Sequence, residues 1–196
     1  MKKIFTIGYS PFTTDTFVQF IRKYNINAVV DVRSAPYSAY RTDFNKANIQ
    51  KILKEYGIAY VFLGDQVGAR AEDPEVYIDG IADYGLISKS SAFQEGLDRI
   101  RAGSKKYVIT LMCAEKDPIT CHRTILIAKN LRNEFFIEHI LEDGNIETHK
   151  DLEKRLLRLH SLDQLKLPGL SNTQNSLEEA YKMQGSKIAY RVEAPA

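Results

Sequence analysis

Residues 107–131, YVITLMCAEKDPITCHRTILIAKNL, join an apolar strand-like run to a helix-like run through a loop that holds both cysteines of the chain. Residues 108–112 are rich in β-branched side chains, which is the pattern of a strand covered on both faces in a parallel sheet. Asp117 and the proline after it break regular structure, and Asp117 or Thr120 would cap the helix that carries the apolar residues of 125–131. The stretch therefore predicts a strand, a loop and a helix of an α/β fold.

The loop between them is expected at the carboxyl end of the strand, where open α/β sheets bind their ligands. Cys113 and Glu115 end the strand, and we expect Cys121, His122 and Arg123 in the first turn of the helix. A helix start carries unpaired N–H groups and a partial positive charge, so it favours an anion and lowers the pKa of a thiol. Arg123 would add a fork of donors for a phosphate or a carboxylate. The sequence therefore predicts a site at this loop.

Strand-like and helix-like segments alternate on both sides of this stretch, which is typical of α/β proteins. The β-α-β order implies right-handed parallel crossovers. We predict further strands at residues 3–7, 27–32, 58–63 and 134–141, and helices at residues 13–24, 46–56, 92–101 and 149–162. The fold class that follows is α/β: a single three-layer domain over residues 1–162, with a mostly parallel, open, Rossmann-like sheet and a C-terminal helical extension.

Two segments depart from this alternation. Residues 64–91 contain four glycines and an Asp-Pro pair, which predicts a long excursion that serves as a lid, a binding loop or a packed insertion. Residues 163–196 form the second part of the chain, beginning with linker-like sequence at 167–175. Ser176 then starts a capping-box-like pattern. We expect the helix that follows to pack back on the domain, because its apolar side chains need cover.

Composition sets broad limits on the class of protein. At 196 residues, 44% hydrophobic and 27% charged, the chain is long enough for one domain with a substantial core. A net charge of +2 and a pI near 8.4 argue neither for nor against a nucleic-acid partner. The chain starts without an apolar signal core and has no run of about 20 apolar residues, so we expect a cytoplasmic protein without a membrane partner. In that compartment Cys113 and Cys121 are more often thiols than a disulfide, and a transient bridge between them is the alternative.

Polar side chains also follow the other predicted strands, and parallel strands would bring all of them to one edge of the sheet. For each, a structural role competes with a functional one: Asp31 and Arg33 would form a salt bridge, Cys113 a small buried hydrophobe, and His122 a helix cap. The candidate catalytic residues are Cys121, His122, Glu115 and Cys113. The candidate ligand-binding residues are Tyr9, Ser10, Asp31, Arg33, Ser34, Arg41 and Arg123.

Several standard motifs do not fit the sequence. Neither cysteine stands at the distance from Arg123 that a phosphatase loop needs, and neither a dinucleotide fingerprint nor a P-loop is present. A structural zinc site wants four nitrogen or sulfur ligands. Cys113, Cys121, His122 and His139 are the candidates, without a Cys-x-x-Cys pair, so zinc is a weaker alternative and we assign no metal ligands.

Five stretches carry a resemblance to a known family. They are TIGYS (6–10), VVDVRSAPYS (29–38), YVFLGDQVGAR (60–70), MCAEKDPITCHR (112–123) and EHILEDG (138–144). On these motifs the chain, over roughly residues 3–145, resembles the family of the domain of unknown function 488. The resemblance implies an α/β protein and carries no reaction that can be transferred.

Three hypotheses about function follow from the residues. The first is an enzyme acting on a phosphorylated or nucleotide-like ligand, with Arg33 and Arg123 holding the anion and Cys121 as nucleophile or redox thiol. The second is a nucleotide- or nucleic-acid-binding module without catalysis, in which Tyr9, Tyr37 and Tyr40 stack on bases. The third is a partner-binding protein in which the cysteines and charges are a structural network. The cofactor is left unassigned.

Overall fold

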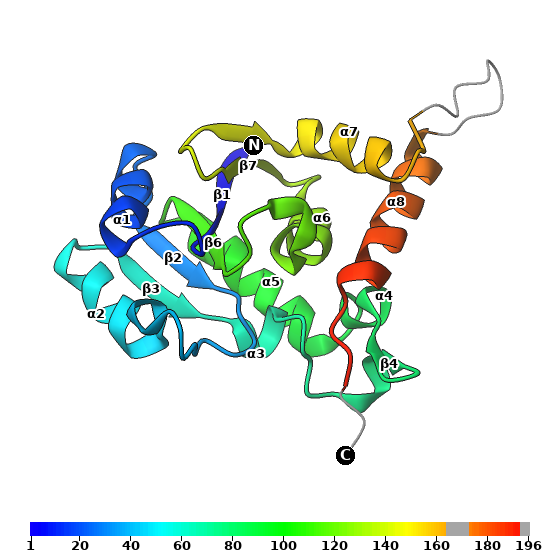
Figure 1. The fold of residues 1–196 in the computed structure, drawn as a ribbon, viewed down its shortest axis with the longest axis horizontal. Coiled ribbons are helices and arrows are strands. Elements are labelled where there is room, and N and C mark those ends of the chain that lie inside the picture. The colour runs from blue at the N-terminus through cyan, green and yellow to red at the C-terminus, as the bar shows by residue number, and fades with distance from the viewer. Residues whose placement is uncertain (164–172, 193–196) are drawn as a thin grey trace.

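The computed structural model describes residues 1–163 and 173–192. Its main sheet has six strands in the order β3-β2-β6-β1-β7-β8, and all neighbours are parallel except β7 and β8. Figure 1 shows helices on both sides of this sheet and a C-terminal helix beyond it, so the prediction of a three-layer α/β fold with a helical extension is confirmed. The strands are β1 (Lys2–Gly8), β2 (Ala28–Asp31), β3 (Ala59–Phe62), β6 (Ile109–Cys113), β7 (Phe135–Ile140) and β8 (Ile146–Thr148).

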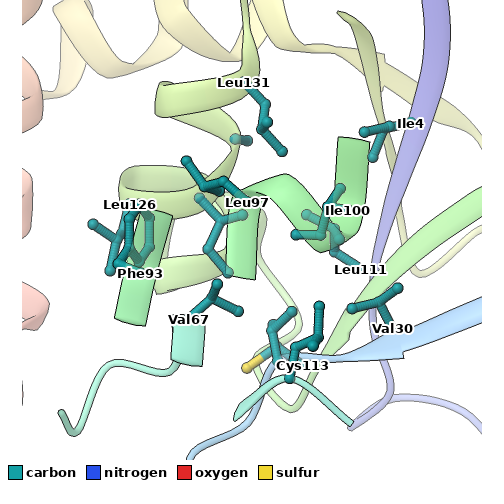
Figure 2. Close-up of a cluster of buried hydrophobic side chains, with 14 of the residues drawn as sticks. Ile4, Val30, Val67, Phe93, Leu97, Ile100, Leu111, Cys113, Leu126 and Leu131 are labelled. Carbon is teal, nitrogen blue, oxygen red and sulfur yellow. The ribbon is translucent and has the colours of Figure 1, made fainter. Parts of the chain in front are cut away.

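Two apolar clusters cover the two faces of the sheet. On one face α1 (Thr14–Lys23) and α2 (Lys46–Glu55) bring Phe17, Ile21 and Leu53 against the strands. On the other face lie α3 (Gly64–Val67), α5 (Ser91–Ser104) and the π-helical segment η4 (Arg123–Ala128), followed by α6 (Lys129–Leu131). Figure 2 shows Cys113 among the aliphatic side chains of this second cluster. Cys121 belongs to the same cluster, so both cysteines are part of the core.

The central strand β6 lies between β2 and β1, which places its carboxyl end beside theirs. Cys113 is in register with Gly8, and the backbone bonding continues past the strands, because the Tyr9 N–H donates to the Cys113 carbonyl at 3.0 Å. On the other side the Val32 N–H donates to the Met112 carbonyl at 3.1 Å. Three strand ends therefore meet at one edge of the sheet.

The excursion at residues 64–91 has a local structure of its own. After α3 it forms the short 3-10 helix η2 (Pro74–Val76), the hairpin of β4 (Tyr77–Ile78) and β5 (Ile81–Ala82), and α4 (Tyr84–Ile87). The Asp83 carboxylate caps α4 by accepting from the Leu86 N–H at 2.8 Å. The hairpin is tied to the end of the chain, since the Ala82 N–H donates to the Tyr190 carbonyl at 2.9 Å. The excursion also packs in the apolar cluster that contains α5, through Val76, Ala82 and Ile87.

The C-terminal part adds α7 (His149–Leu159) and α8 (Thr173–Ile188). In Figure 1, α8 runs from α7 to α4, and it also contacts η4. Helix α8 begins inside the stretch predicted as a linker, three residues before Ser176, and residues 167–172 of that linker lie outside the described residues. The strand β8 was not predicted. None of the helices in the described part of the chain has the length and apolar content that crossing a bilayer requires.

Candidate functional site

The loop after β6 is built differently from the expected strand-loop-helix. Asp117 does act as a cap, but of the short 3-10 helix η3 (Pro118–Thr120), where its side chain accepts from the Ile119 N–H at 3.1 Å. Cys121 then has extended backbone angles, φ −130° and ψ 141°. The expectation that Cys121 lies in the first helical turn is therefore wrong, since it precedes that turn. The helix itself opens as the π-helical segment η4, a rare form that is frequent at functional sites.

His122 is fixed between a backbone carbonyl and the two cysteines. Its Nε2 lies 2.9 Å from the Val32 carbonyl oxygen, which only accepts, so Nε2 carries the hydrogen. The other ring nitrogen, Nδ1, lies 3.8 Å from the sulfur of Cys113 and 3.8 Å from the sulfur of Cys121. One imidazole nitrogen thus faces both thiols, while the other is held by Val32, the residue after β2.

Arg123 does not offer its guanidinium to a ligand. The side chain is fully buried, and it donates to the Glu115 carbonyl at 2.7 Å, the Lys116 carbonyl at 3.3 Å and the Thr6 hydroxyl at 3.4 Å. Within the described residues it has no carboxylate partner. The predicted anion fork is therefore occupied by the backbone of the cysteine loop, which Arg123 holds in place.

A glycine in β1 closes the same loop from behind. A Cβ atom on Gly8 would lie 1.7 Å from the Glu115 carbonyl oxygen, so only glycine permits this approach. Together with the Arg123 bonds, the contact fixes the backbone at Glu115.

The two sulfurs differ in their electrostatic surroundings. Burial opposes ionisation of Cys121, but the thiol of Cys113 and the positive charges of Arg123 and His122 outweigh it and lower the pKa of Cys121 well below the ordinary thiol value. Burial and the neighbouring Cys121 raise the pKa of Cys113 well above that value. Burial also works against a protonated His122, yet the charge of Cys121 outweighs this and raises the pKa of His122. The arrangement favours a Cys121 thiolate beside a His122 imidazolium.

Glu115 connects this cluster to solvent. The residue is exposed, while Cys113, Cys121 and His122 are 2%, 1% and 7% exposed. Its carboxylate nevertheless turns towards the thiols, with Oε2 2.9 Å from the Cys121 sulfur. Partial removal of the carboxylate from water and the charge of Cys121 raise the pKa of Glu115. We call Cys113, Glu115, Cys121 and His122 the thiol cluster.

The second group of predicted residues lies on the opposite face of the sheet, with α1 and α2. Arg33 forms a buried bidentate pair with Asp31, at 2.8 Å from Nε and 2.6 Å from Nη2, and also donates to the Phe44 carbonyl at 2.9 Å. The Tyr60 hydroxyl donates to Asp31 at 2.7 Å. The guanidinium stacks over the Tyr9 ring, 5.0 Å from its centroid. Of the described buried atoms, Arg33 Nη1 is one that has no hydrogen-bond partner.

The remaining predicted ligand-binding residues also engage in local contacts. Arg41 donates to the carbonyls of Ser10 at 2.8 Å and Phe12 at 2.5 Å. The Ser34 hydroxyl accepts from the Arg70 N–H at 2.9 Å. The predicted edge therefore divides into the thiol cluster, whose cysteines pack with α3, α5 and η4, and the Arg33 group, which contacts Tyr9 and Phe44 on the other face.

A cavity of about 670 Å³ lies between β4, β5, α4, η4 and α8. None of the thiol cluster lines it, but Tyr84 does. Burial raises the pKa of Tyr84, and charge on Cys121 and Glu115 adds to the rise. Sequence reasoning missed Tyr84, since no local pattern distinguishes it from the other tyrosines of the chain.

Comparison with known proteins adds one finding. Residues 13–129, more than half of the chain, match the family model described as domain of unknown function DUF488. The matched span includes the whole loop from Cys113 to Arg123 and the excursion at residues 64–91. Comparison with curated proteins and with solved structures gave no match. The chain belongs to the family of the domain of unknown function DUF488.

Proposed function

We propose that this protein is an enzyme whose nucleophile is Cys121. The observation that carries the proposal is the position of His122, whose Nδ1 faces the Cys121 sulfur at 3.8 Å while its Nε2 is fixed by the Val32 carbonyl. A nucleophile, a base and a group that orients the base are the elements of an activated thiol. Both cysteines are free thiols, which fits the reducing cytoplasm that we propose as its location.

In the proposed reaction the Cys121 sulfur forms a bond to an electrophilic atom of the ligand. The proton that the thiol has already given to Nδ1 of His122 passes to the leaving group, so that one bond forms, one breaks and the proton is conserved. Glu115, at the solvent side, exchanges protons with the ligand as it enters or leaves. Cys113 keeps its proton and supports the thiolate.

The sequence also predicts a phosphorylated or nucleotide-like ligand, and this part of the proposal has less support than the nucleophile has. Arg123 donates to backbone groups, and Arg33 lies on the other face of the sheet. The thiol cluster therefore offers nucleophilic chemistry without an arginine clamp, and the proposal requires only an electrophile that reaches Cys121 beside Glu115.

Alkylation of the folded chain by iodoacetamide at neutral pH, with a chelator present, tests the proposal. We expect mass spectrometry to find Cys121 modified before Cys113, and His122→Gln to slow the reaction of Cys121 by about 100-fold, the contribution of a positioned base. His160→Gln, a histidine outside the cluster, is the matched control. Equal labelling of both cysteines, or a rate that ignores His122, would show that Cys121 is not activated.

A second candidate function, binding of a nucleotide or a nucleic acid without catalysis, has its own support on the opposite face. Tyr37 and Tyr40 are 73% and 96% exposed in the loop after β2, near the partly exposed Arg41. Exposed tyrosines next to arginine provide stacking platforms and charge for single strands. The unpartnered Nη1 of Arg33 is a further donor for an anion.

Anisotropy of a fluorescent single-stranded oligonucleotide at two salt concentrations separates the two candidates. Binding should weaken with salt and should fall in a Tyr37→Ala/Tyr40→Ala variant, whereas Tyr56→Ala and Cys121→Ser should bind as the wild type does. Binding that ignores salt, or that survives loss of both tyrosines, would exclude this candidate.

A further inference from the structure

We infer that Cys113, Cys121 and His122 form a binding site for Zn²⁺. The two sulfurs and Nδ1 of His122 all lie within 4.8 Å of one another in a buried position. Thiolates and imidazoles are ligands that Zn²⁺ prefers, whereas harder cations such as Mg²⁺ prefer oxygen ligands. The inference goes beyond the proposed function, because here the same three atoms hold a metal ion and none of them acts as a nucleophile.

The distances fit a tetrahedral ion. Zn–S bonds of about 2.3 Å and Zn–N bonds of about 2.0–2.1 Å place a sulfur and a nitrogen ligand about 3.6 Å apart at the tetrahedral angle. Nδ1 of His122 lies 3.8 Å from each sulfur. A shift of about 0.2 Å would bring each of these two sulfur–nitrogen distances to the tetrahedral value.

The surroundings of these ligands are those of a metal site as well. A ligating histidine almost always donates its other N–H to a carbonyl or carboxylate, and Nε2 of His122 does so to Val32 at 2.9 Å. The Arg123 bonds and the close approach of Gly8 hold the backbone between the two cysteines. The three ligands are therefore held in place by the fold before an ion arrives.

Charge and access determine the fourth position. Two thiolates cancel the charge of Zn²⁺, which lowers the free-energy cost of burying the ion in the thiol cluster. Glu115 is exposed and lies 2.9 Å from the Cys121 sulfur, so it or a water fills the fourth position from the solvent side. If Glu115 binds, its negative charge is matched by Arg123, which has no carboxylate partner among the described residues.

Zinc and a nucleophilic Cys121 are alternative uses of one set of atoms. A bound ion occupies the sulfur that would attack, so zinc-loaded protein should not react with iodoacetamide, and a chelator should restore the reaction. The two ideas fail separately: alkylation in chelator tests the nucleophile, and metal spectra test the ion.

The test is titration of the chelator-treated full chain with Co²⁺, followed by Zn²⁺ competition and by metal analysis after gel filtration. We expect one ion per chain, sulfur-to-cobalt charge-transfer absorption and the strong visible bands of a four-coordinate site. Cys113→Ser, Cys121→Ser and His122→Gln should each weaken binding by more than about 100-fold, since loss of a ligand costs more than loss of its supporting partner.

Two variants serve as matched controls. His160→Gln should bind as the wild type does, and Glu142→Gln is the control for Glu115→Gln, which we expect to weaken binding less than the three ligand variants do. Absence of charge-transfer absorption in the wild type would overturn the inference whether or not any variant folds. It would also be overturned if folded ligand variants bound Co²⁺ as tightly as the wild type.

Discussion

Mild acid should destabilise this protein through His149, a buried histidine outside the thiol cluster. His149, at the start of α7, is 5% exposed. Its two ring nitrogens lie 3.0 Å from Nε2 of His139 and 2.9 Å from the hydroxyl of Tyr181 on α8. Burial and the charge of Arg132 lower the pKa of His149 from 6.5 to about 4. Glu153, 3.6 Å away, gives little compensation in acid, because burial raises its own pKa.

The sign and size follow from proton linkage. Between the unfolded pKa of 6.5 and the folded value of about 4, the unfolded chain binds a proton at His149 that the folded chain does not. Stability contributed by neutral His149 is therefore present at pH 7 and is lost as the pH falls. The loss is about 2 kcal/mol at pH 5 and about 3 kcal/mol at pH 4. His139, whose pKa burial also lowers, adds to it.

Urea unfolding at pH 7 and pH 5, followed by circular dichroism, measures the effect. Because carboxylates also titrate in acid, the quantity to compare is the pH-dependent loss in the wild type minus that in His149→Gln, expected to be about 2 kcal/mol. The control His160→Gln should follow the wild type. An equal loss in the wild type and His149→Gln would refute the assignment of a neutral, buried imidazole.

Three substitutions extend these predictions. Arg123→Met should lower the free energy of unfolding by about 3 kcal/mol, because it removes two charge-assisted hydrogen bonds to the Glu115 and Lys116 carbonyls; unfolding at the wild-type midpoint would contradict this. Gly8→Ala should cost about 1–3 kcal/mol, since the new methyl group meets the Glu115 carbonyl, and a thermal melt unchanged from the wild type would show that the loop yields. Asp31→Asn should cost about 3–5 kcal/mol by leaving Arg33 as a buried unpaired charge. Urea titration measures it, and a cost below 1 kcal/mol would mean that the pair is not a buried one.

Most strands of the sheet could be predicted because their sequences are short apolar runs rich in β-branched residues. The run at 108–112 is apolar and β-branched, and it is covered on both faces as such runs require. The strand β8 is three residues long and has no such run. Its pairing with β7 depends on the turn at Gly144, φ +73°, and not on its own residues.

Of the candidate site residues, the sequence predicted only in part which ones lie together. Cys113, Glu115, Cys121 and His122 do meet, because a single loop carries them. Arg33 does not join them, since a one-residue alternation along the chain after β2 sends it to the other face. No sequence pattern could show that Arg123 donates to backbone carbonyls, because these hydrogen bonds depend on how closely the loop after β6 approaches β1.

The order of the strands sets a limit on how this protein can be divided. The family match begins after β1 and ends before β7, yet β1 is inserted between β6 and β7. A recombinant fragment trimmed to the matched residues would leave one side of β6 as a bare apolar edge, and exposed edges of that kind pair with other chains. Such a fragment should aggregate on expression, and the segment recognised across the family is smaller than the unit that folds.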